Sequence, residues 1–228
     1  MALIEFQNVE KTYKLGETQV TGLKNVHLSI QNKGFVSFVG PSGSGKTTLL
    51  NLLGCIDKPT SGKVIIQGVE TNSLNRKKAA DFRGENIGFI FQNFNLLPVL
   101  TVYENIEFPL ISVKNIEKKA RKQWVEEILN EVGLYDKRNH KPDQLSGGQR
   151  QRVAIARALV IKPRMVLADE PTANLDHKTA LSIMQLMHRI KESRGTLFVF
   201  ATHDPKIMQI AETIYELEDG VIINKKEQ

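Results

Sequence analysis

The segment from Gly40 to Thr47 combines residue types that bind phosphate. It fits the pattern G-x-x-x-x-G-K-[ST] at every fixed position. The glycines let the backbone curl so that successive N–H groups point inward, and the loop opens into a helix N-terminus that carries roughly half a positive charge. Such a concave surface suits a di- or triphosphate. We therefore predict that this segment, called the phosphate-binding loop below, binds a nucleotide.

Two side chains of the loop would bind charged groups. Lys46 would neutralise the β- and γ-phosphates as a point charge, and the Thr47 hydroxyl would join the coordination shell of Mg²⁺. The competing interpretation is a glycine-rich turn, but this spacing should arise by chance in well under about 1 % of chains of this length. The predicted nucleotide-binding residues are Gly40, Pro41, Ser42, Gly43, Ser44, Gly45, Lys46, Thr47 and Thr48.

Further candidate residues follow predicted strands. The apolar run Met165–Ala168 is typical of a strand buried on both faces, and it ends in Asp169 and Glu170. The first carboxylate would hold Mg²⁺, and the second would activate an attacking water. Gln92 would bind the metal or position water, and His203 would reach the γ-phosphate. Each of these four is an ordinary residue alone, and the combination with the loop points to catalysis.

The order of elements predicts an α/β fold. An apolar strand, Phe35–Val39, precedes the loop and a helix, Thr48–Leu53, follows it, which is the context that the pattern requires. Strands and helices alternate again after residue 161, so we expect a parallel-rich central sheet flanked by helices, with ligands at the carboxyl ends of its strands. Strands at Leu3–Val9 and Val26–Ile30, joined by a turn at Lys11–Gly16, would form an antiparallel β part.

The middle of the chain has a different texture. Val102–Leu110 and Glu117–Val132 show helical spacing without an intervening strand. We expect an inserted α-helical subdomain at residues 93–160, with residues 1–92 and 161–228 forming the core of one domain that spans 1–228.

The segment from Leu145 to Gln149, called the signature segment below, predicts a second anion site. Ser146 is a good N-cap, and the glycines expose backbone N–H groups at a helix start. A plain serine-capped helix is the alternative, and it would be favoured in a chain without a phosphate-binding loop. The residues assigned to this site are Ser146, Gly147, Gly148 and Gln149.

Bulk properties limit the functional classes. With 41 % hydrophobic and 25 % charged residues among 228, the chain has the composition of an ordinary globular protein. Its single cysteine, Cys55, excludes an internal disulfide and favours a reducing compartment and a buried thiol. We expect neither a signal peptide nor a membrane span. The net charge of +6 is dispersed, which favours solvated helix faces over a nucleic-acid surface.

These motifs together resemble an ABC-type ATPase over essentially the whole chain. They appear in the family's order and approximate spacing, as Gly40–Thr47, Gln92, Leu145–Gln149, Met165–Glu170, Asn174–Asp176 and Thr202–Asp204. The resemblance implies a Mg²⁺-dependent ATPase that forms a head-to-tail homodimer on ATP. Two ATP molecules would each lie between one protomer's phosphate-binding loop and the other's signature segment.

The resemblance also implies roles for single residues. Tyr13 would stack on adenine, Gln92 would sense the γ-phosphate, and Glu170 would be the general base. His203 would act as a switch, and Asp176, assigned to the nucleotide site, would communicate across the dimer.

A finer resemblance is to the ATP-binding subunits of lipoprotein-releasing and macrolide-efflux (LolD/MacB-like) systems. It rests on Tyr13–Gly16, Asn93–Leu97 and Thr101–Ile106, together with Glu17, Val20, Leu23 and Val26. It implies a peripheral protein on the cytoplasmic face of the inner membrane, driving a separate integral membrane permease, with no nucleic-acid partner. We expect the permease to dock near Phe94–Val102, where apolar residues concentrate. The alternative is a non-transport ABC ATPase that regulates a cell-division or cell-wall membrane protein. A small-molecule kinase would leave the signature segment unexplained.

Overall fold

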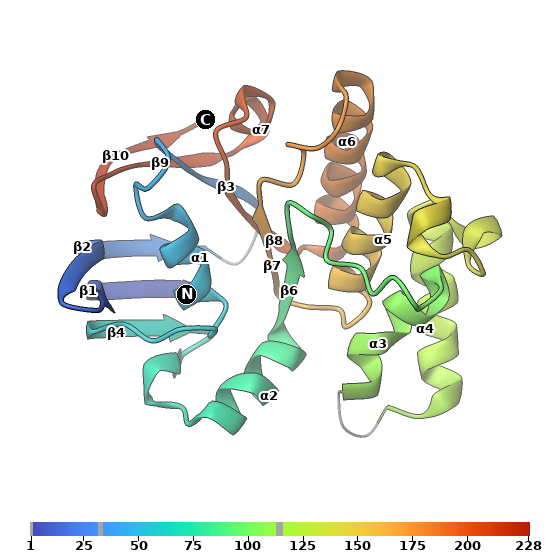
Figure 1. The fold of residues 1–228 in the computed structure, drawn as a ribbon, viewed down its shortest axis with the longest axis horizontal. Coiled ribbons are helices and arrows are strands. Elements are labelled where there is room, and N and C mark those ends of the chain that lie inside the picture. The colour runs from blue at the N-terminus through green and yellow to red at the C-terminus, as the bar shows by residue number, and fades with distance from the viewer. Residues whose placement is uncertain (1, 32–33, 113–115) are drawn as a thin grey trace.

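A computed structural model describes residues 2–31, 34–112 and 116–228 of the chain (Figure 1). Its α/β fold contains two sheets with helices around them, as the order of elements predicted. In the described residues no helix is both long enough and apolar enough to cross a membrane.

The larger sheet is parallel except at one edge. Its six strands lie in the order β10-β9-β3-β8-β7-β6, and only the outermost pair, β10 and β9, is antiparallel. The strands are β3 (Gly34–Val39), β6 (Ile87–Ile90), β7 (Met165–Asp169), β8 (Leu197–Ala201), β9 (Thr213–Glu218) and β10 (Val221–Glu227). The parallel-rich sheet predicted from the alternation of strands and helices is therefore confirmed.

The smaller sheet is antiparallel and lies at the N-terminal side (Figure 1). Its strands are β1 (Ile4–Leu15), β2 (Thr18–Ile30), β4 (Ser61–Ile66) and β5 (Val69–Glu70), in the order β2-β1-β4-β5. The predicted turn at Lys11–Gly16 was wrong, because β1 continues through Leu15 and the chain reverses only at Gly16, whose φ is 62°. Register shifts within β1, which interrupt the regular pairing with β2, explain why the alternation was not recognised.

The helices lie between and beside the sheets. In Figure 1, α1 lies between the smaller sheet and the larger one, and α3, α4, α5 and α6 gather beyond the larger sheet. They are α1 (Lys46–Leu53), α2 (Arg76–Asn86), α3 (Val102–Ser112), α4 (Lys118–Glu131), α5 (Gly147–Leu159), α6 (His177–Arg194) and α7 (Pro205–Ile210). Short 3₁₀ turns occur at Thr71–Ser73, Tyr135–Lys137 and Pro142–Gln144.

Alternate residues of the central strands fill two separate cores. In β8, Phe198 and Phe200 pack toward α3, α4, α5 and α6, whereas Leu197 and Val199 pack toward α1 and the smaller sheet. All four side chains are fully buried. Since burial of a large apolar side chain contributes roughly 1.5–3 kcal/mol, the sheet is held from both faces. Buried Cys55 belongs to the second core, as expected from the apolar sequence around it.

Buried Asn105 of α3 fixes the loop that leads into this helix. Its Nδ2 lies 2.9–3.1 Å from the carbonyl oxygens of Leu97, Leu100 and Thr101, and its Oδ1 accepts a 2.8 Å hydrogen bond from the Leu97 N–H. The side chain is completely buried. The Asn105 amide therefore contributes directly to holding the segment before α3 in place.

We expect Asn105→Leu to lower the free energy of unfolding by about 2–4 kcal/mol, since the Leu97 N–H would lose its acceptor and the Leu97 and Leu100 carbonyls would lose the amide donor. Urea denaturation measures this change. Asn130→Leu is the matched control, because exposed Asn130 makes one hydrogen bond on the surface of α4 and its replacement should cost under about 0.5 kcal/mol. Equal losses in the two variants would contradict this role for Asn105.

Candidate nucleotide-binding site

The phosphate-binding loop connects β3 to α1, as predicted, and its backbone requires glycine. Gly40 and Gly45 have φ angles of 152° and 104°, which L-residues with a side chain rarely adopt. A Cβ atom on Gly40 would collide with the carbonyl oxygen of Leu217, and one on Gly45 with that of Gly22. The loop is thus wedged between the strand β2 and the β9–β10 hairpin.

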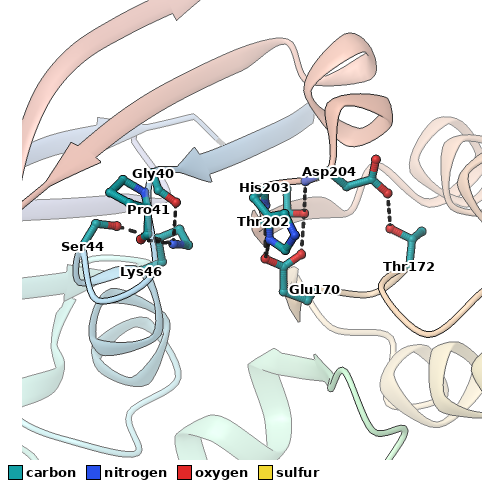
Figure 2. Close-up of polar contacts among 9 residues, drawn as sticks. All are labelled: Gly40, Pro41, Ser44, Lys46, Glu170, Thr172, Thr202, His203 and Asp204. Carbon is teal, nitrogen blue, oxygen red and sulfur yellow. Dashed lines mark hydrogen bonds and ion pairs between the residues drawn. The ribbon is translucent and has the colours of Figure 1, made fainter.

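Lys46 folds back onto the loop that it follows. Its ammonium donates 2.8 Å hydrogen bonds to the carbonyl oxygens of Gly40 and Pro41 (Figure 2). Burial lowers the pKa of Lys46, against the opposing effect of the Glu170 and Asp169 carboxylates. A phosphate arriving at the loop would supply a stronger partner than two carbonyls.

The phosphate-binding loop opens onto a cleft of about 660 Å³ that contains most of the predicted site. Chain segments far apart in the sequence meet here because the parallel strands β3, β8, β7 and β6 lie next to one another in that order, so their carboxyl ends are on the same edge of the sheet. The predicted residues that line the cleft are Tyr13, Gly40, Pro41, Ser42, Gly43, Gly45, Lys46, Thr47, Thr48, Gln92, Asp169, Glu170 and His203. Ser44 belongs to the loop but is buried beneath it.

Glu170 is held by the residues that follow β8. Its Oε2 accepts a 2.8 Å hydrogen bond from the Thr202 hydroxyl, and its Oε1 accepts one of 3.1 Å from the His203 backbone N–H (Figure 2). The Nδ1 atom of the His203 ring lies 2.5 Å from the same Oε1. An ionised carboxylate only accepts, so a hydrogen bond at this contact would use the Nδ1–H tautomer of His203 and leave Nε2 for another partner.

Glu170 also has an unusual backbone. Its φ of 44° lies in the left-handed region, which costs a non-glycine residue of the order of 1 kcal/mol or more. Its N–H still donates to the Ala201 carbonyl of β8 at 2.9 Å, and the left-handed conformation then turns the main chain away from the sheet. The strain and the hydrogen bonds together fix the carboxylate at the edge of the cleft.

Side chains that could hold a divalent cation lie around the same cleft. Thr47, Gln92 and Asp169 offer a hydroxyl, an amide carbonyl and a carboxylate, and Mg²⁺ prefers such oxygen donors alongside phosphate oxygens. Burial, and to a lesser degree the Glu170 charge, raises the pKa of Asp169, whereas Lys46 opposes the shift. A cation beside Asp169 would offset this cost, so these residues fit a Mg²⁺ site.

Tyr13 borders the cleft from β1. The Lys11 ammonium lies over its ring, 4.8 Å from the ring centroid, and Lys11 also forms an ion pair with Asp57 at 2.7 Å. Burial raises the pKa of the Tyr13 hydroxyl. The ring lies beside Thr48, at the start of α1.

Residues not assigned from sequence also line the cleft. Val20, Thr21 and Gly22 of β2 take part, and a Cβ atom on Gly22 would meet both Thr48 and the Tyr13 ring. The pairing of Tyr13 with Val20 brings them there. A β1–β2 hairpin, if recognised in the sequence, would have revealed them.

The signature segment lies away from this cleft. Ser146 caps α5, with its Oγ accepting from the Gln149 N–H at 3.3 Å, while Gln149 Oε1 accepts from the Ser146 N–H at 2.9 Å. Ser146, Gly148 and Gln149 line a separate hollow of about 290 Å³ beside α6. Asp176 caps α6 nearby, accepting from the Thr179 N–H at 3.0 Å. The two glycine-rich segments of one chain thus line separate hollows and do not face each other across one cleft.

The fold and the cleft together define a P-loop nucleotide-binding protein. Comparison with known families then gives a narrower assignment. The profile of the ABC transporter family matches residues 23–173, and the chain belongs to this family.

Close relatives agree with this membership. The ABC transporter ATP-binding protein MJ0796 of Methanocaldococcus jannaschii is 48 % identical over 223 residues, which cover 96 % of this chain and 95 % of that protein. The macrolide export ATP-binding/permease protein MacB of Syntrophobacter fumaroxidans is 43 % identical over 223 residues, covering 97 % of this chain but 31 % of that protein. The resemblance noted from the motifs is thereby confirmed.

A solved structure extends the comparison to three dimensions. The MJ0796 cassette, determined as a dimer in a post-hydrolysis state bound to ADP and phosphate, superimposes with a TM-score of 0.90. It is 46 % identical, and the match covers 98 % of each chain. The protein is therefore an ATP-binding cassette and an ATPase of the ABC type.

We expect Lys46→Ala to weaken ATP binding by about 10- to 100-fold, since charge-assisted hydrogen bonds contribute roughly 1.5–3 kcal/mol. Titration with a fluorescent ATP analogue measures this. Exposed Lys24 on β2, outside the cleft, provides the control variant Lys24→Ala, which should bind like the wild type. Unchanged affinity in Lys46→Ala would contradict the assigned role of the loop.

Proposed function

We propose that the protein forms a head-to-tail homodimer on ATP and hydrolyses ATP in two composite sites. The separation of the phosphate-binding loop from the signature segment in one chain carries this proposal. Each is an anion site with only part of the groups that would surround a triphosphate. A second copy, turned around, would bring its signature segment over the first copy's cleft. The dimeric structure of the MJ0796 cassette supports this arrangement.

Within a composite site, the residues divide the work. The phosphate-binding loop and Lys46 would hold the β- and γ-phosphates, and Tyr13 would stack on the adenine. Glu170, oriented by Thr202 and His203, would accept a proton from the attacking water. The His203 Nε2, free of the Glu170 contact, would face the γ-phosphate. Gln92 would contact the γ-phosphate and transmit its presence to the loop that follows Gln92 in the chain.

A divalent cation bound by Thr47, Gln92 and Asp169 would neutralise charge on the phosphates during transfer. From the other protomer, Ser146, Gly147, Gly148 and Gln149 would complete the phosphate contacts through the N-terminus of α5. Asp176 would carry contacts across the dimer from the start of α6.

We expect Glu170→Gln to reduce steady-state ATP hydrolysis by at least about 100-fold, since the proton acceptor is lost. It should still bind ATP and accumulate as a dimer, detected by size-exclusion chromatography with light scattering. Exposed Glu127 on α4 gives the control Glu127→Gln, which should hydrolyse ATP normally. Full turnover by Glu170→Gln would exclude Glu170 as the general base.

The cassette would work on a separate membrane permease of the LolD/MacB type, at the cytoplasmic face of the membrane. MacB supports this, because that relative is described as a combined ATP-binding and permease protein. An apolar groove of about 390 Å³ offers a docking surface, with Phe89, Phe91, Phe108 and Ile161 in its lining. From the stretch expected to contact the permease, residues 94–102, Asn95 contributes to this lining.

The groove is joined to the nucleotide site through Arg157. Its guanidinium donates to the carbonyl oxygens of Phe94 and Asn95, two residues in the left-handed region with φ of 60° and 47°. Burial lowers the pKa of Arg157. The same loop begins at Gln92, whose carbonyl accepts from the Asn174 side chain at 2.9 Å. A partner bound in the groove would therefore contact residues that hold the loop containing Gln92.

We expect Phe108→Glu and Leu97→Glu to abolish co-purification with the permease while leaving the ATPase of the isolated protein intact. Phe108 and Leu97 expose 49 % and 38 % of their surface, so the change costs little stability. Pull-down from detergent-solubilised membranes with ATP in the Glu170→Gln background measures the association. Leu181→Glu is the control, since Leu181 is 43 % exposed on α6, outside both the groove and the stretch 94–102 that contains Leu97. Unchanged co-purification of the charged variants would place the docking site elsewhere.

A further inference from the structure

Gln151 on α5 is a completely buried polar residue that the proposed chemistry does not use. It lies two residues after Gln149, on the same helix as the signature segment, and its helical neighbours Val153, Ala154 and Ile155 are buried and apolar. Its Oε1 has no hydrogen-bond partner in the described residues. Burying an amide only half satisfied costs roughly 1–3 kcal/mol, so this glutamine calls for an explanation other than packing.

The other half of the amide makes a short contact with the loop that carries Glu170. The Gln151 Nε2 donates a 2.6 Å hydrogen bond to the carbonyl oxygen of Pro171, the residue directly after Glu170. Proline has no N–H, so its carbonyl is the backbone group through which this position can be held. A leucine of similar size would fill the space but would leave that carbonyl without its donor.

The rest of the Glu170 loop, defined as residues 170–175, is tied to other parts of the nucleotide site. The Thr172 hydroxyl donates a 2.6 Å hydrogen bond to Oδ2 of Asp204, the residue directly after His203 (Figure 2). The Asn174 amide donates to the Gln92 carbonyl at 2.9 Å. Gln151 therefore provides a buried hydrogen bond from this loop to α5, the helix whose N-terminus is the signature segment.

We infer that Gln151 is a positioning residue that fixes the Glu170 carboxylate relative to the signature helix. The inference rests on the proposed function, in which the signature segment of a protomer serves its partner's ATP while Glu170 serves its own. Docking of α5 on the partner's nucleotide would be transmitted through Gln151 to Pro171 and so to Glu170. The two composite sites would then influence each other through a buried hydrogen bond within each chain.

Gln151→Leu and Gln151→Met test this inference, because both fill the space and remove the donor. We expect kcat for ATP hydrolysis to fall about tenfold, since misplacement of a catalytic group by about 1 Å can cost up to about 100-fold. The KM for ATP should stay within about twofold, and the Hill coefficient should approach 1. In the Glu170→Gln background, ATP-dependent dimerisation should match that of Glu170→Gln alone.

The control is Gln123→Leu, on the surface of α4, where the glutamine pairs with Glu127. Its kinetics should match the wild type. Wild-type turnover and cooperativity in both Gln151 variants would overturn the inference. Loss of ATP-dependent dimerisation would also overturn it, because Gln151 would then act in ATP binding or dimer formation. Failure of both variants to show a cooperative unfolding transition would overturn it as well. If the wild type itself neither dimerised nor hydrolysed ATP, the proposed function would fail instead.

Discussion

Burial of both faces of the central strands of the six-stranded sheet decides where chemistry can occur in this protein. Side chains of β7 and β8 alternate between two apolar cores, so a polar group in the middle of these strands would lack a partner. The first positions open to ligands are at the carboxyl ends. Asp169 and Glu170 follow β7, His203 follows β8, Gln92 follows β6, and the phosphate-binding loop follows β3. The cleft is the place where these ends meet.

The same constraint explains how much of the site could be predicted from sequence. A strand buried on both faces is a continuous apolar run, as in Met165–Ala168, and the polar residues after it mark its end. The glycines of the phosphate-binding loop are required by close contacts with Leu217 and Gly22, and such a requirement leaves a strict pattern in the sequence. Local signals therefore located the main chemical groups and the two sheets' general character.

Strand pairing was harder to predict, because it depends on contacts between distant segments. The β9–β10 hairpin was not anticipated, although Asp219 and Gly220, with φ of 47° and 81°, form the Asp-Gly turn that most strongly indicates a hairpin. This hairpin supports the phosphate-binding loop, since the Gly220 N–H donates to the Ser44 carbonyl at 3.1 Å. In the β1–β2 hairpin, bulges hid the alternation, so Tyr13 was assigned to a turn.

The electrostatics of the cleft distinguish the groups proposed for nucleotide binding from the group proposed for hydrolysis. Burial lowers the pKa of Lys46 and raises that of Asp169, so the fold disfavours both charges before a ligand arrives. A triphosphate with a divalent cation would supply the opposite charge to each, and its binding would therefore stabilise the folded cleft. Glu170 differs, because its carboxylate is already held by Thr202 and His203. Under the proposed function, nucleotide binding would use the groups near Lys46, whereas hydrolysis would depend on the position of the Glu170 loop, which is set by the elements around it.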